Sequence, residues 1–365
     1  MDKSRRKILS SLLTAGIAGG AIANGLKLNA KETADGFIFQ DEKFYNLKKD
    51  NINSIPILPA GLKQASKIAI VAPASHASSW ELRSMMKTMN NLGIEVEIGD
   101  TIKNYSVNTK YFSAPDEVRA KELMDYIERD DINAIMTCRG GYGVLRILDM
   151  LNFKTICENP KIIIGFSDIT ALLNAVYQKC NIVTYHGPVG ISSFNSITLK
   201  SFEDILLHKD DFKEITYTDS RINTINNGIA TGRLIGGNLT MLASTLGSPY
   251  EIETESKILF IEEVSEDPYK IDRMLTQLHL SKKLQDCAGI MFGHYPTLDK
   301  KYYFYPNLSY TAREVIESRL KQLNIPAVIG IPIGHIEDKW TMPIGVLAEL
   351  DADKKEIKIL EQTVS

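Results

Sequence analysis

A serine lies where a buried strand is expected to run into a helix. The stretch 161–170 contains three successive isoleucines, then the turn residues Gly165, Phe166, Ser167 and Asp168, and leads into a helix predicted to end near residue 179. Such a turn presents a serine hydroxyl at the carboxyl edge of a sheet, close to free helix N–H groups that can stabilise an oxyanion. Serine is also a good helix N-cap, so this stretch alone is consistent with a nucleophile or with a cap.

A second motif is the glycine-rich loop 139–143, with Arg139, Gly140, Gly141, Tyr142 and Gly143. It follows a predicted strand at 132–137 and opens a short helix, so its backbone N–H groups can point at an anion. It lacks the G-x-G-x-x-G spacing and the lysine of a P-loop, and therefore indicates a nucleotide only weakly. An oxyanion hole, a carboxylate pocket and a plain turn with a surface arginine all fit the pattern.

A serine hydrolase also needs a base and an acid. Of the six histidines, His186, His294 and His335 each follow a predicted strand. None of the histidines shows H-x-x-x-H spacing, which makes zinc a minor option. We assign His335 as the base and Glu262, the first residue after the apolar strand 257–261, as the acid, with Glu263 as the alternative. The order nucleophile, acid, base matches that of α/β-hydrolases, although chain order does not define a triad.

The composition is that of an ordinary globular protein. The chain has 365 residues, about two domains' worth, and its net charge of -3 gives no reason to expect nucleic acid as a partner. The four cysteines are Cys138, Cys157, Cys180 and Cys287, and none shows C-x-x-C spacing. We therefore expect buried thiols, and export would allow one disulfide to form.

The amino terminus is typical of an export signal. Arg5 and Arg6 precede a modestly apolar run at 8–23 that is rich in Gly, Ala, Ser and Leu. The pattern predicts a twin-arginine signal peptide within residues 1–30, cut after Ala23 or Ala30. The run is short for a membrane span, so we expect no stable span after processing and a periplasmic protein. Residues 31–65 are predicted to form a linker or arm.

Strands alternate with helices from residue 66 to 190, which predicts an α/β domain with a parallel, Rossmann-like sheet and an active site at the carboxyl ends of its strands. Residues 191–225 have few periodic signals and are predicted to be a crossover linker. Residues 226–365 are predicted to form a smaller, β-rich α/β domain that carries the glutamate and histidine. Within it, 231–239 reads as a strand, a glycine turn and a helix start, and 341–360 as a closing hairpin.

Several motifs together resemble those of the LD-carboxypeptidases, a family of serine peptidases. The resemblance covers roughly residues 66–352 and rests on five stretches: 139–143, 165–170, 232–239, 260–275 and 333–345. It implies an amino-terminal α/β domain joined to a smaller β-rich domain, with the active site between them. It also implies a triad of Ser167, Glu262 and His335, an oxyanion hole from the N–H groups of Asp168 and Gly141, and no metal or organic cofactor.

The implied reaction removes the terminal D-Ala of a murein tetrapeptide by cutting a bond between an L-configured centre and D-Ala. Recognition of the free carboxylate is assigned on charge to Arg139 or Arg233. Members of the family are often dimers, which leaves a homodimer open. Typical members recycle cell-wall peptides in the cytoplasm, so the export signal is a departure that points to periplasmic trimming of stem peptides.

Two alternatives stay open. Some family members hydrolyse a peptide-nucleotide antibiotic and confer immunity, and Trp340, close to His335 in sequence, could stack on a base or serve as a hydrophobic lid. The other alternative is a non-catalytic periplasmic peptide-binding protein, against which the serine, glutamate and histidine motifs argue.

Overall fold

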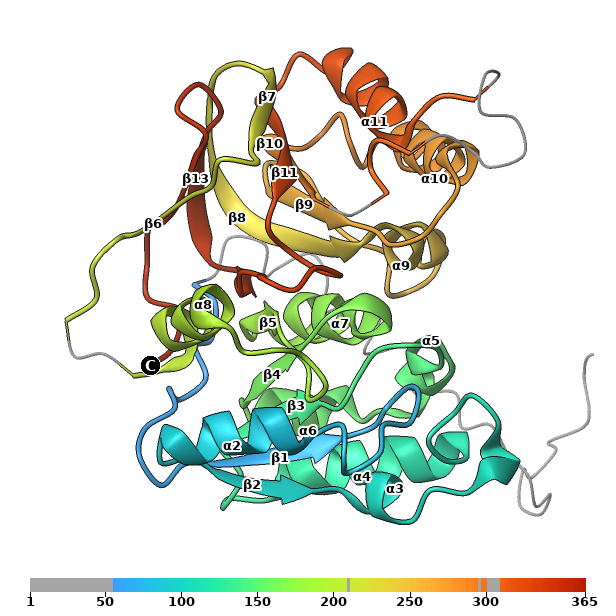
Figure 1. Ribbon diagram of the computed structural model, residues 1–365, viewed down its shortest axis with the longest axis vertical. Coiled ribbons are helices and arrows are strands. Elements are labelled where there is room, and N and C mark those ends of the chain that lie inside the picture. The colour runs from blue at the N-terminus through green and yellow to red at the C-terminus, as the bar shows by residue number, and fades with distance from the viewer. Residues whose placement is uncertain (1–54, 209–210, 295–296, 301–308) are drawn as a thin grey trace, which may run out of the picture. The chain divides into compact units, whose positions relative to one another are not determined.

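The computed structural model describes residues 55–208, 211–294, 297–300 and 309–365. These belong to a single compact unit of two sheets flanked by helices (Figure 1). The predicted signal peptide and most of the predicted linker lie outside the described residues. In the described ranges, no helix is both long enough and apolar enough to cross a membrane.

The first sheet is built mainly from parallel strands, as the alternation of strands and helices predicts. β1 to β5 pair in parallel in the order β5-β4-β3-β1-β2, and β12 joins β5 antiparallel at the edge. Four of the five residues of β1 are buried, which suits a strand covered on both faces. The strands are β1 (Lys67–Val71), β2 (Glu95–Ile98), β3 (Ala134–Thr137), β4 (Ile162–Gly165), β5 (Thr184–His186) and β12 (Met342–Ile344).

Helices follow these strands along the chain. The helices are α2 (Arg83–Asn91), α3 (Asp100–Lys103), α4 (Asp116–Glu128), α5 (Val144–Ile147), α6 (Phe153–Glu158), α7 (Thr170–Cys180) and α8 (Ser196–Leu206). α7 contacts β5 of the first sheet and β8 of the second, and Figure 1 shows it between the two sheets. Two side chains of α7 bond to β8, because Thr170 Oγ1 accepts from Asn238 N at 2.9 Å and Asn174 Nδ2 donates to Gly236 O at 2.9 Å.

The second sheet has a parallel centre and antiparallel edges. Its order is β6-β14-β13-β8-β9-β10-β11-β7, with β8 to β11 parallel. The strands are β6 (Ile215–Thr218), β7 (Asn223–Asn226), β8 (Ile229–Asn238), β9 (Ile258–Glu262), β10 (Gly289–Gly293), β11 (Ala327–Ile331), β13 (Leu347–Asp351) and β14 (Glu356–Ile359). The helices are α9 (Leu239–Ser244), α10 (Pro268–Leu280) and α11 (Ala312–Lys321).

Three segments differ from the sequence prediction. Residues 191–225, expected to be a linker, contain α8, β6 and β7; α8 forms because Asn195 caps it and Phe202, Ile205 and Leu206 give it a buried face. β8 continues through its glycines instead of turning. The expected strand at 341–350 is divided by Gly345, at φ 100° and packed against Tyr177, so that β12 joins the first sheet and β13 the second.

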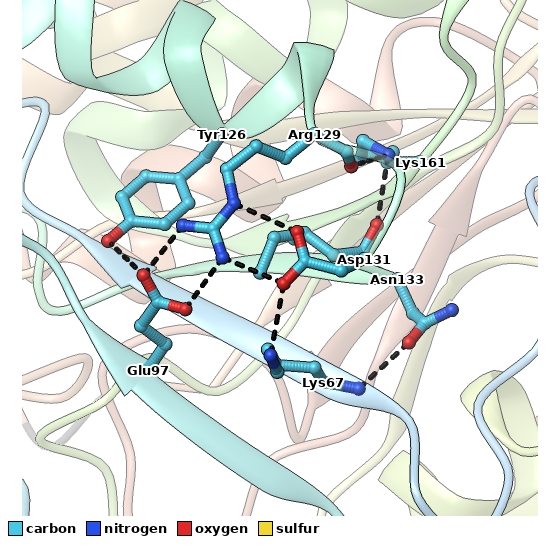
Figure 2. A network of polar contacts seen from close by, with 8 residues as sticks. Lys67, Glu97, Tyr126, Arg129, Asp131, Asn133 and Lys161 are labelled. Atoms are coloured by element: carbon cyan, nitrogen blue, oxygen red, sulfur yellow. Dashed lines mark hydrogen bonds and ion pairs between the residues drawn. The ribbon is translucent and has the colours of Figure 1, made fainter.

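A charged network occupies the amino-terminal edge of the first sheet, opposite the carboxyl ends of its strands (Figure 2). Arg129 bonds both oxygens of Glu97, at 2.6 and 2.9 Å, and both oxygens of Asp131, at 2.9 and 2.8 Å. Asp131 also accepts from Lys67 at the start of β1. The network joins β1 and β2 to the loop before β3, and its position indicates a structural role.

Cys157 of α6 and Cys180 of α7 form a disulfide, while Cys138 and Cys287 are free and buried. The bond joins the helix of the predicted nucleophile to its neighbour across a sequence separation of 23 residues.

We expect the double variant Cys157→Ser, Cys180→Ser to lose about 3 kcal/mol of unfolding free energy, because the bond restricts the unfolded chain. Urea unfolding measures the loss, and a reductant should reproduce it in the wild type. Cys287→Ser serves as the control, since it keeps the disulfide and should lose stability in reductant as the wild type does, whereas the double variant should not respond. A double variant as sensitive to the reductant as Cys287→Ser would count against this disulfide.

Candidate active site

Ser167 occupies a strained turn at the carboxyl end of β4. Its φ is 66°, and a 3-10 helix over Ser167–Ile169 leads into α7. A non-glycine residue pays about 1 kcal/mol or more for this conformation, which therefore persists only where the surroundings fix it. Within the described ranges the hydroxyl makes no capping bond, and Ile169 is the N-cap of α7. The helix-cap interpretation is therefore wrong, and no capping role accounts for the hydroxyl.

The glycine-rich loop packs directly against this serine. A Cβ on Gly140 would lie 2.7 Å from Ser167 Cβ and 2.9 Å from its Oγ, so only glycine fits without a shift. Gly141, at φ 108°, lies against Ser75, whose Oγ accepts from Tyr142 N at 3.2 Å. In the part of the chain that the structure describes, the N–H groups of Gly140 and Gly141 donate to no protein acceptor. The loop therefore carries two free donors, and Gly140 lies directly against the serine.

Glu262 and His335 meet at the end of the second sheet. Glu262 is the last residue of β9, and His335 follows β11; His335 Nδ1 lies 2.7 Å from Glu262 Oε2. Gly334, at φ 77°, has no room for a Cβ beside this carboxylate. Phe166, the residue before Ser167, packs edge-on against the imidazole with ring centroids 4.9 Å apart. His335 therefore lies next to the serine turn.

Glu263 has a different environment. Its carboxylate accepts from Thr240 N at 2.9 Å, from Thr240 Oγ1 at 2.7 Å and from Val264 N at 2.8 Å, which ties it to the start of α9. Burial raises the pKa of Glu263, although these donors oppose the change. Of the two adjacent carboxylates, Glu262 is the one that contacts the imidazole.

His186, at the end of β5, approaches the other oxygen of Glu262. Its Nε2 lies 3.8 Å from Glu262 Oε1, and both residues are fully buried. Burial favours the neutral acid, but the two imidazoles outweigh burial and hold the pKa of Glu262 near 2. Because 3.8 Å is longer than a hydrogen bond, we attribute the effect of His186 on the pKa of Glu262 to electrostatic attraction between the imidazole and the carboxylate. The sequence grouped His186 with the histidines that follow strands and gave it no role.

Asp168 ties the serine turn to the glycine-rich loop. Its buried carboxylate accepts from Val144 N, the first residue of α5, at 2.8 Å. Burial raises the pKa of Asp168 to about 6, although that N–H group and the charge of Arg119 act in the opposite direction.

This pKa predicts a pH-dependent stability. Between about pH 4 and pH 6 the folded state keeps a proton that the unfolded chain releases, so ionisation lowers stability as pH rises through this window. Asp168→Asn keeps a neutral acceptor for Val144 and does not titrate. Relative to the wild type, we expect its unfolding free energy to gain about 2–3 kcal/mol between pH 4 and pH 7 in urea titrations. A constant difference over that range would contradict the assigned pKa.

Two of the three predicted substrate-binding residues are engaged elsewhere. Arg233 Nη1 lies 2.6 Å from Glu361 Oε1 and donates to Gly345 O at 2.7 Å. The Trp340 ring is 4% exposed and stacks on Tyr217 with centroids 4.8 Å apart, so the structure places it in the core. Arg139 is half-buried in the glycine-rich loop, where its charge acts on His76 and Glu81.

A serine turn, free loop donors and a Glu–His pair on two sheets define a hydrolase-like site, and the family comparison agrees. Residues 68–187 match the LD-carboxypeptidase N-terminal domain and residues 231–350 its C-terminal domain. The chain belongs to the LD-carboxypeptidase family.

Named relatives extend over most of the chain. A probable murein peptide carboxypeptidase of Bacillus subtilis is 33% identical over 323 residues, 86% of this chain and 97% of the relative. The microcin C7 self-immunity protein MccF of Escherichia coli is 30% identical, over 86% of this chain and 98% of its own.

Solved structures agree with the fold. A structure of MccF matches with a TM-score of 0.77 at 27% identity, over 85% of this chain and all of its own. The muramoyltetrapeptide carboxypeptidase of Oxalobacter formigenes matches with a TM-score of 0.69 at 29% identity, over 81% and 99%. The two-sheet α/β fold is therefore confirmed.

Proposed function

We propose that the protein is a serine carboxypeptidase that removes the terminal D-Ala of murein tetrapeptides by hydrolysing the L,D bond before it. The observation that carries the proposal is the Glu262–His335 contact of 2.7 Å beside the strained serine turn at Ser167. Relatives named as murein peptide and muramoyltetrapeptide carboxypeptidases support the choice of substrate.

In the proposed mechanism His335 removes the Ser167 proton as the hydroxyl attacks the scissile carbonyl. Glu262, bonded to Nδ1, fixes the tautomer and stabilises the imidazolium that forms. The N–H groups of Asp168 and Gly141 hold the oxyanion, and His335 returns the proton to the leaving amine of D-Ala. Water then hydrolyses the acyl-enzyme by the same route.

The test is mass spectrometry of a murein tetrapeptide incubated with purified protein. We expect loss of one alanine from the peptide that ends in D-Ala and none from the diastereomer that ends in L-Ala. Cleavage of both would leave a carboxypeptidase without L,D specificity. Binding of the peptide with no cleavage of either would favour the non-catalytic binding protein.

A second candidate is hydrolysis of a peptide-nucleotide antibiotic. The MccF relative favours it, since MccF is a self-immunity protein and one of its structures holds aspartyl sulfamoyl adenosine. The stacking argument from Trp340 gives no support, because that ring is packed on Tyr217. To separate the two candidates, kcat/KM is measured for an aminoacyl sulfamoyl adenosine and for the murein tetrapeptide. The substrate with the higher kcat/KM identifies the function.

We further propose that the protein acts in the periplasm after twin-arginine export. The support is the signal-like sequence at residues 1–30 and the Cys157–Cys180 disulfide, a bond typical of proteins outside the cytoplasm. Cell fractionation of the wild type and of Arg5→Lys, Arg6→Lys tests this. Mature protein found only in the cytosol of wild-type cells would overturn it.

A further inference from the structure

A buried lysine lies in the same loop as His335. Lys339 is 5% exposed, and its Nζ donates to Glu337 O at 3.3 Å. Within the described ranges no carboxylate lies within ion-pair distance of this Nζ. Two acids whose charges act on it are engaged with other partners: Asp338 pairs with Arg221 at 2.7 Å, and Glu262 contacts His335.

A buried cation whose partners are one carbonyl and the face of one aromatic ring is an expensive arrangement. Charges are buried almost only when they are paired, because removal from water costs several kcal/mol per ion. Burial correspondingly lowers the pKa of Lys339, with the charges of Asp338, Glu337 and Glu262 acting in the opposite direction. An ammonium group has three donors, and one carbonyl uses only one of them. An anion that arrives from solution would supply the missing partner.

The position of this cation relative to the reacting groups is informative. Lys339 Nζ lies 5.6 Å from the centre of the Phe166 ring, and the same ring contacts His335. Phe166 directly precedes Ser167, so nucleophile, base and cation are arranged around one aromatic side chain. In a carboxypeptidase the leaving amine receives its proton from the base, and its carboxylate carbon lies only about 2.5 Å from that nitrogen by standard bond lengths.

We propose that Lys339 binds the free α-carboxylate of the leaving residue and so restricts the enzyme to peptides with an unblocked carboxyl terminus. The inference rests on the proposed function and deepens it, because it names a residue that would select the end of a peptide. The sequence assigned this role to Arg139 or Arg233 on charge, and Arg233 is held by Glu361.

The experiment pairs two substrates with three variants. The substrates are a murein tetrapeptide and the same peptide ending in D-alaninamide, and kcat/KM is measured for the wild type, Lys339→Met, Arg139→Met and Lys257→Met. Lys257 is a matched control, because it is a lysine of 9% exposure at the opposite end of β9 from Glu262. We expect Lys339→Met to lower kcat/KM for the carboxylate peptide about 30- to 100-fold, with little change for the amide. Lys339→Arg should restore part of the preference.

A stability measurement accompanies the kinetics. If the cation serves the ligand and not the fold, Lys339→Met should have a melting temperature no lower than that of the wild type, since an unpaired buried charge has been removed. Without turnover, D-alanine should raise the melting temperature of the wild type more than D-alaninamide does, and this difference should vanish in Lys339→Met.

The outcomes separate the two proposals. If the wild type cleaves neither peptide, the proposed function fails, and the D-alanine shift still tests the carboxylate site. If the wild type prefers the carboxylate and Lys339→Met keeps that preference, the role of Lys339 is overturned. Loss of the preference in Arg139→Met alone would assign the role to Arg139.

Discussion

Replacing Ser167 with alanine should lower kcat for the tetrapeptide by about 10⁴-fold or more, because no other group can form the acyl-enzyme. Binding should survive, so the variant should still retain the peptide in an equilibrium binding assay. Ser167→Cys should keep measurable activity through a thiolate nucleophile. Turnover by the alanine variant within tenfold of the wild type would remove Ser167 from the mechanism.

The strained backbone offers a control for this variant. At φ 66° glycine is favoured over alanine, so Ser167→Gly should be more stable than Ser167→Ala by about 1 kcal/mol while being equally inactive. Urea unfolding of the two variants measures the difference. Equal inactivity with different stability would show that activity is lost through the hydroxyl and not through unfolding.

Glu262→Gln should lower kcat by about 10³- to 10⁴-fold with little change in KM, because an amide can support the wrong tautomer of His335 and cannot stabilise its cation. The wild-type carboxylate stays ionised down to about pH 2, so its titration should not shape the activity profile at higher pH. The pH dependence of kcat, measured beside the wild type, checks both statements.

Glu263→Gln is the matched control, one residue away and equally buried. Its carboxylate holds Thr240 at the start of α9, so we expect the variant to lose mainly stability, about 1–3 kcal/mol, and less than tenfold in kcat. A larger loss of kcat in Glu263→Gln than in Glu262→Gln would reverse the assignment of the acid.

The local patterns were readable because each depends on a short stretch of chain. The apolar run before Gly165 indicates a buried strand, and Ser167 after it indicates a strand-to-helix turn in which the serine is a nucleophile or a helix cap. The glycine-rich loop was a candidate for the same edge because parallel strands bring their carboxyl ends together. In the structure Gly140 does pack on Ser167.

What the sequence did not indicate depends on contacts between distant segments. His186 approaches Glu262 only because β5 and β9 belong to sheets that pack together, and no spacing encodes that distance. From the sequence, Arg233 was a candidate cation for the substrate carboxylate. In the structure it pairs with Glu361, which lies 128 residues further along the chain. α8 was missed because its polar residues obscured the buried face of Phe202, Ile205 and Leu206.

The path of the chain around His335 has a mechanical consequence. The loop that carries this residue leaves β11 in the second sheet and enters β12 in the first. Its two ends are therefore fixed in different sheets. The carboxyl terminus also contacts the start of the described chain, because Ser365 N donates a hydrogen bond to Pro59 O and Ser365 O accepts one from Gly61 N. The two sheets therefore belong to one compact unit that the chain crosses more than once. Alignment of base and nucleophile is therefore a property of the whole assembly and not of a stiff local loop.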